Sequence, residues 1–266
     1  MDAQLFGSVD KPAVIVVSSW DPLVPESRAF LRELVTYTRA HDQSAVAIVL
    51  DPAPQRYLRG PSKWPVYMSF RARSHWLFCQ GLDGVVRIDF REPDLKRGVY
   101  DLLDIVRAQI PLAEIWMRPN QTFGRVAPGS RMAVAMYAKR HALAWKSPRT
   151  PETRVIANTV HHHLWRGQIT KAEAVVGLPP MWSRPESGLF EVAWPAGRYY
   201  VALATLETPV RYGEPFAVEL HEDVDGISRI EWPAPDAEHL VILGGPGDAD
   251  VWRLASARES VAATIR

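Results

Sequence analysis

The stretch Arg154–Pro180, RVIANTVHHHLWRGQITKAEAVVGLPP, carries the clearest helix signals of the chain. Asn158 is a good helix-capping residue, and Gly167 is a residue type at which helices end. A second helix is predicted over Thr170–Val176, because Gly177 and the prolines after it stop a helix. The stretch therefore predicts two short helices, the first of them beginning at Asn158.

Before this stretch, short apolar runs alternate with longer amphipathic segments. This alternation is typical of a parallel sheet covered by helices. Strands are predicted at Ala13–Val17, Ala45–Leu50, Val85–Asp89, Ala113–Met117 and Ala142–Trp145. Helices are predicted at Glu26–Arg39, Ser69–Gln80, Pro93–Gln109 and Ser130–His141. We therefore expect an α/β fold in this part of the chain.

After Pro179, Pro180 and Pro185 the pattern changes to short strands separated by turn residues. These strands are predicted at Leu189–Trp194, Tyr199–Thr205, Phe216–Glu222, Ile227–Trp232 and Leu240–Leu243. Turn signals such as the Asp-Gly pair at 225–226 favour an antiparallel meander or a small barrel. The sequence thus predicts two domains, 1–184 and 185–266, of which the second is a smaller antiparallel β domain.

Composition excludes several classes of partner. The chain has 266 residues, 47% of them hydrophobic, and a net charge of +1. So balanced a charge gives no general attraction to nucleic acid or to a membrane surface. No apolar run approaches about 20 residues and no signal-peptide pattern occurs, so we expect a cytoplasmic protein without a membrane partner. The single cysteine, Cys79, excludes an internal disulfide and is expected to be buried.

Polar residues follow the predicted parallel strands, where ligands collect in sheets of this kind. They are Ser18, Ser19, Trp20 and Asp21 after the first strand, Asp51 and Pro52 after the second, and Arg118 and Asn120 after the fourth. Their convergence on one sheet edge predicts a polar ligand pocket. Because the same residue types are ordinary turn formers, a purely structural role stays open.

Four segments resemble those of a known family and occur in the same order along the chain. They are AVIVVSSWDPLVPESRAFL, VAIVLDPAPQRYL, ARSHWLFCQGLDGVVRIDF and RPNQTFGRVAPGS. With the helical stretch, they resemble the adenylyl-transfer domain of bacterial FAD synthetases. Trp20 and Asp21 stand at the family's Phe-Asp pair, and Asp51 and Pro52 match its Asp-Pro strand end. Asn120 stands at the aspartate of its Gly-x-Asp-Phe-x-Phe-Gly loop, in which Phe123 and Gly124 are kept.

The resemblance implies a Rossmann-like nucleotidyltransferase fold whose relatives join an adenylyl group from ATP to FMN, using magnesium. The segment FEVAWPAGRYYVALATL resembles a hairpin of the riboflavin-kinase barrel that follows in this family. No Pro-Thr-Ala-Asn motif remains, so the second domain resembles a truncated barrel. Riboflavin kinase activity is therefore not expected.

Several positions that handle phosphate in the family are changed. Val24 and Ser27 stand where the family has two histidines in its first loop, Ala53 where it has a third, and His161 where it has an arginine. Losing one donor to the developing charge costs about 2.7–4 kcal/mol of transition-state stabilisation. We therefore expect adenylyl transfer to be lost or much weakened, and we assign no catalytic residue.

Binding depends less than catalysis on those side chains. The amides at the start of the Asn158 helix could receive a phosphate, with Asn158 and Thr159 in contact with it, or Asn158 could only cap the helix. Neighbouring histidines on a helix point about 100° apart, so His161, His162 and His163 predict no metal site. Ser27 lies in no nucleophile elbow.

Three functions follow from the sequence. The first is a protein that binds a flavin or an adenine nucleotide, with FMN, FAD, ATP or AMP as ligand and magnesium needed only for catalysis. The second is an active nucleotidyltransferase with a rebuilt phosphate site, in which Arg125, Lys146, Arg154 or a histidine replaces the lost cations. The third is a non-catalytic regulatory or scaffold subunit with a protein partner.

Overall fold

A computed structural model divides the chain into two compact units. The first comprises Met1–Leu58 and Ser74–Thr153, and the second comprises Arg59–Arg73 and Arg154–Arg266. The structure describes residues 2–59, 65–91, 93–94, 97–118, 130–148, 154–185, 189–192, 194–205, 211–213, 216–222, 228–233 and 238–248.

The first unit is built on a mostly parallel sheet with the strand order β1-β4-β3-β2-β5-β6. The strands are β1 (Asp2–Gly7), β2 (Ala13–Ser18), β3 (Ser44–Asp51), β4 (Gly84–Asp89), β5 (Leu112–Trp116) and β6 (Ala144–Lys146). All five predicted strands are present, although β6 begins later than predicted. The antiparallel edge strand β1 was not predicted, because its short sequence DAQLFG is only half-buried and mixes polar with apolar residues.

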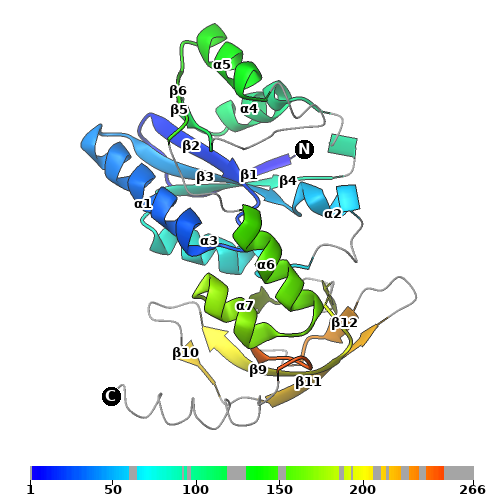
Figure 1. Ribbon diagram of the computed structural model, residues 1–266. Coiled ribbons are helices and arrows are strands. Elements are labelled where there is room, and N and C mark those ends of the chain that lie inside the picture. The colour runs from blue at the N-terminus through cyan, green and yellow to red at the C-terminus, as the bar shows by residue number, and fades with distance from the viewer. Residues whose placement is uncertain are drawn as a thin grey trace. The chain divides into compact units, whose positions relative to one another are not determined.

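Helices cover both faces of this sheet, as Figure 1 shows: α1 and α3 lie on one side, and α4 and α5 on the other. The helices are α1 (Pro25–Ala40), α2 (Pro54–Arg59), α3 (Phe70–Cys79), α4 (Val99–Arg107) and α5 (Ser130–Arg140). The central strands are buried on both faces, which is why Ala13–Val17 reads as a continuous apolar run. Successive residues alternate between faces, so Ile15 and Ile115 join the core beneath α4 and α5.

The strand order places a topological switch point between β2 and β5. Strand β2 pairs in parallel with β3 on one side and with β5 on the other. Chain connections therefore leave the sheet in opposite directions at this point, and in open α/β sheets such a point, beyond the carboxyl ends of the strands, is where ligands bind. The loop into α1 follows β2 there, and Met117 and Arg118 follow β5.

The second unit combines two helices with an antiparallel sheet. Its helices are α6 (Arg154–Trp165) and α7 (Ile169–Val176), and α7 packs on β13. The strands are β7 (Met181–Ser183), β8 (Leu189–Val192), β9 (Gly197–Thr205), β10 (Arg211–Tyr212), β11 (Phe216–Glu222), β12 (Ser228–Glu231) and β13 (His239–Gly244). The sheet order is β7-β13-β9-β11-β12-β8, with β10 paired to β9.

The two predicted helices of the Arg154–Pro180 stretch are both present. Gly177 adopts the left-handed conformation (φ 70°) at the end of α7, and its N–H donates to the Glu173 carbonyl. Gly167 is also left-handed (φ 64°), and its N–H donates to the Leu164 carbonyl. Both glycines therefore end helices as predicted, because residues with a Cβ rarely adopt this conformation.

The amino end of α7 is capped from a distant part of the chain. The Asp248 carboxylate accepts hydrogen bonds from the backbone N–H of Ile169 (2.9 Å) and from the Thr170 hydroxyl (2.5 Å). It also accepts one from the backbone N–H of Gly245 (2.9 Å). The local N-cap residue, Gln168, makes no side-chain cap bond, so Asp248 supplies the cap and fixes the segment after β13 to α7.

Three predictions differ from the structure. Helix α6 begins at Arg154, so Asn158 lies one turn inside it and is not its cap. Cys79 is exposed, because it lies at the carboxyl end of α3 with its sulfur 3.6 Å from His75 Nε2. Helix α4 begins at Val99, because Gly98 and Asp101 form a capping interaction there: the Gly98 N–H donates to the Asp101 carboxylate.

The division into units also differs from the predicted boundary between residues 184 and 185. Residues 59–73, which include the last residue of α2 and the first turn of α3, belong to the second unit. There the Tyr67 hydroxyl donates to the Leu178 carbonyl (2.6 Å) and Met68 pairs with Met181. Helices α6 and α7 belong there as well, because they pack on each other and α7 packs on β13. Contacts between segments so distant in sequence leave no local signal.

We expect Asp248→Ala to lower the free energy of unfolding by about 1–3 kcal/mol, because the α7 amides lose a charged acceptor. Urea unfolding followed by circular dichroism measures the change. The matched control is Glu33→Ala, which removes an exposed acid of α1 in the first unit. Equal effects of the two substitutions would contradict the capping role of Asp248.

Candidate functional site

The loop after β2 is held by Trp20. This residue adopts a left-handed backbone conformation (φ 55°), which is rare for a bulky side chain, and it is only 2% exposed. Its indole N–H donates to the Ile48 carbonyl of β3 (3.1 Å), and its backbone N–H donates to the Ser18 hydroxyl (3.4 Å). An unusual backbone conformation fixed by tertiary contacts is common at binding sites.

Arg118 lies against this loop at the end of β5. Its guanidinium carbon is 4.7 Å from the centroid of the Trp20 ring and 5.4 Å from that of Phe30. Its Nη2 donates to the Ser27 hydroxyl of α1 (3.2 Å). Burial lowers the pKa of Arg118 to about 10, so the side chain is still positively charged at neutral pH.

The start of α1 adds a second positive element. Pro25 occupies the first turn, and Val24 at the N-cap offers no side-chain hydrogen bond to the helix amides. The positive end of the α1 dipole and the Arg118 charge therefore both lie near Ser27, within the first turn of the helix. This combination favours an anion such as a phosphate or a carboxylate.

Asp51, at the end of β3, is held in an ion pair. Its Oδ2 accepts hydrogen bonds from Nε (3.1 Å) and Nη2 (2.8 Å) of Arg87, a residue of β4. Pro52 is half-buried, and Asp21 is buried in the loop after β2. The sequence had suggested that Asp51 faces a ligand, whereas the structure shows that Arg87 orients and neutralises its carboxylate.

The remaining predicted site residues are Asn120, Phe123, Asn158 and Thr159. Asn120 and Phe123 lie outside the described residues. Asn158 and Thr159 belong to the second unit, where both are exposed inside α6. The α6 N-terminus is at Arg154, so the amides of Asn158 and Thr159 are not those of a helix start.

The histidines of α6 differ in environment. His161 is buried and 6.4 Å from Trp165 between ring centroids, whereas His162 is exposed and His163 is half-buried. Over the described ranges, no group of three or more His, Cys, Asp or Glu side chains is placed to hold a metal ion.

Glu114 organises a second cluster on the same face of β5. The residue is 3% exposed, and its carboxylate accepts hydrogen bonds from the Tyr37 hydroxyl (2.9 Å) and the Trp116 indole N–H (3.0 Å). Lys146 Nζ lies 3.3 Å from Glu114 Oε1 and 3.7 Å from the centroid of the Tyr37 ring. The cluster thus joins α1, β5 and β6 around one buried charge.

The sequence contained a signal for this arrangement that our interpretation did not use. Residues Glu114, Trp116 and Arg118 alternate along β5 and beyond its end, so their side chains share one face of the sheet. On α1, Ser27, Phe30 and Tyr37 recur at helical spacing and meet them. Arg118 was noted only as a residue at a strand end, and neither Glu114 nor Tyr37 was predicted to be a site residue.

Comparisons with known proteins address the fold. No protein-family model and no curated protein matches the sequence. The structure is similar to that of a macrolide-efflux protein from Streptococcus pneumoniae, with a TM-score of 0.58 and 12% sequence identity. The similarity covers 96% of this chain and 94% of that chain. At this identity the likeness shows a shared fold alone. None of the helices in the described part of the chain is long and apolar enough to cross a membrane.

We expect Trp20→Phe to lower the free energy of unfolding by about 0.5–1.5 kcal/mol, because it removes the indole N–H and leaves the Ile48 carbonyl without this donor. Urea unfolding measures the effect. Trp165→Phe is the matched control, since Trp165 is 42% exposed at the end of α6. If Trp20→Phe lowered the free energy of unfolding no more than the control does, the anchoring role of Trp20 would be contradicted.

Proposed function

We propose that the chain is an FAD-synthetase-like protein that binds a flavin or an adenine nucleotide beyond the carboxyl ends of β2 and β5. The observation that carries the proposal is the position of Arg118, a partly buried cation that donates to Ser27 near the start of α1. FMN, FAD, AMP and ATP all carry phosphate, the group that this arrangement suits best. In this proposal the first unit is a Rossmann-like nucleotidyltransferase domain, and the second is a shortened riboflavin-kinase-like domain.

The phosphate is the part of the ligand for which the described residues offer a partner. A charge in a partly buried site interacts more strongly with an anion than it would in water, because less solvent screens it. Trp20, in contrast, is buried and its ring lies under the Arg118 guanidinium, so we assign it to holding the cation and not to stacking on a ligand ring.

Weak or absent adenylyl transfer is part of the same proposal. Val24 and Ala53, which stand at two of the histidine positions of the resembling family, are both buried and carry no charge. Ser27 stands at a third and offers only a hydroxyl. Three cationic donors to the transferring phosphates are therefore missing from the side chains at these positions.

A second candidate, an active nucleotidyltransferase with a rebuilt phosphate site, is favoured by one contact. Arg118 reaches Ser27, so a positive charge lies beside a position at which the resembling family has a histidine. Lys146, which the sequence had suggested as a replacement, lies against Glu114 and lines a pocket that includes neither Ser27 nor Arg118. In this second function Arg118 would stabilise the charge of the transferring phosphate, and magnesium would be required.

We expect Arg118→Met to weaken FMN binding by roughly 10- to 150-fold, the effect of losing a charged hydrogen bond worth about 1.5–3 kcal/mol. Isothermal titration calorimetry measures the affinity. Riboflavin, which lacks the phosphate, is the matched ligand, and its affinity should change little. Arg32→Met, which removes an exposed arginine of α1, is the matched protein control.

Failure to bind FMN, FAD, AMP and ATP would overturn the proposed function. If Arg118→Met lowered the affinities for FMN and for riboflavin equally, the proposed phosphate contact would be refuted. Incubation with FMN, ATP and magnesium then separates the two functions. No FAD supports a binding protein, whereas FAD formation that Arg118→Met abolishes supports the rebuilt transferase.

A further inference from the structure

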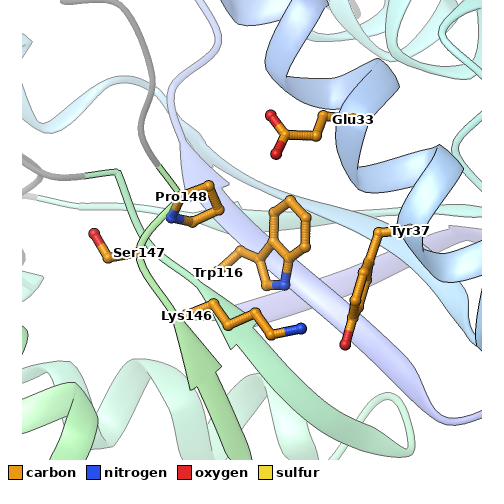
Figure 2. A pocket seen from close by; sticks show the side chains of 6 residues that line it. All are labelled: Glu33, Tyr37, Trp116, Lys146, Ser147 and Pro148. Atoms are coloured by element: carbon orange, nitrogen blue, oxygen red, sulfur yellow. The ribbon is translucent and has the colours of Figure 1, made fainter.

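A pocket of about 370 Å³ opens beside the Glu114 cluster, on the α1 face of the sheet. It is lined by Glu33 and Tyr37 of α1, Trp116 at the end of β5, and Lys146, Ser147 and Pro148 at the end of β6. Figure 2 shows Trp116 at its centre, with Pro148 on one side and Tyr37 on the other. The volume suits a small organic molecule.

Charges of opposite sign stand on two sides of this pocket. In Figure 2 the Glu33 carboxylate lies beyond one edge of the Trp116 ring, and the Lys146 ammonium lies beyond the opposite edge. The Glu33 side chain is exposed and forms no hydrogen bond or ion pair with any other described residue. Its carboxylate is therefore available to a ligand.

Lys146 is held in place by its neighbours. Burial lowers the pKa of Lys146, but the nearby polar groups of Tyr37 and Glu114 outweigh this effect and raise the pKa, so the ammonium stays charged. An ammonium has three N–H donors, and its side chain here is 46% exposed. The buried Glu114 carboxylate pairs with the ammonium on the protein side. Lys146 can therefore contact a second acidic group on its solvent side.

The aromatic walls are not arranged to stack on a free ring. Tyr37 has His41 at 4.1 Å between ring centroids and the Lys146 ammonium at 3.7 Å. Trp116 is 3% exposed and lies 5.0 Å from Tyr37 between ring centroids. The walls thus supply apolar contact, and the two charges supply orientation.

We propose that this pocket binds a small amphoteric molecule, with an amino group toward Glu33 and an acidic group toward Lys146 at the two ends of an apolar body. A ligand with only a positive charge would be attracted by Glu33 but repelled by Lys146. A ligand with only a negative charge would be attracted by Lys146 but repelled by Glu33. A ligand that carries both groups satisfies both charges. This inference is independent of nucleotide binding, because Arg118 does not line the pocket.

Three probes of similar size test the proposal on the full chain. Para-aminomethylbenzoate carries both charges across a benzene ring, whereas benzylamine and para-methylbenzoate each carry one. We expect a dissociation constant in the millimolar range for the first probe, because so small a ligand has few contacts. We expect about three- to fivefold weaker binding of each singly charged probe. Nuclear magnetic resonance titration measures each constant and locates the shifted residues.

Glu33→Gln tests the acidic end, and Glu219→Gln is the control because Glu219 is an exposed acid of β11, outside the pocket. Glu33→Gln should weaken the binding of para-aminomethylbenzoate about three- to fivefold and leave the affinity for para-methylbenzoate unchanged. The proposal is overturned if none of the probes shifts the resonances of Tyr37, Trp116 and Lys146. It is also overturned if benzylamine binds as tightly as para-aminomethylbenzoate, since the pocket would then be a site for cations alone.

Discussion

The buried carboxylate of Glu114 is the constraint around which the seam between α1 and β5 is arranged. A charge removed from water has to be compensated, and here Tyr37, Trp116 and Lys146 compensate it together. These donors come from α1, β5 and β6, so satisfying one carboxylate sets the position of a helix and of the edge strand. The aromatic rings that carry two of the donors also form walls of the neighbouring pocket.

The contacts between α1 and β5 continue to the switch point of the sheet. Phe30 lies 6.0 Å from Trp116 between ring centroids and 5.4 Å from the guanidinium carbon of Arg118. Arg118 is therefore supported by aromatic side chains from α1 and from the loop after β2. The proposed anion site and the proposed amphoteric pocket are thus joined by one row of side chains, in which Phe30 and Trp116 link Arg118 to Lys146.

Much of the fold was predictable, because its signals are local. Buried parallel strands such as Ala13–Val17 are continuous apolar runs, and Gly177 ends α7 where only a left-handed residue fits. The start of α6 was not predictable from its strongest local signal: Asn158 is a favourable cap, yet the helix extends one turn further back to Arg154. The cap of α7 was also hidden, because Asp248 reaches it from a distant segment.

The sequence by itself determined the two classes of secondary structure, most strand positions and the sheet edge at which polar residues gather, since each depends on periodicity along the chain. Only the tertiary structure decided which of those residues meet. It paired Asp51 with Arg87 and brought Arg118 to Ser27 across 91 positions of sequence. Such contacts depend on which strands become neighbours and on which face each side chain lies, and these are properties of the assembled sheet.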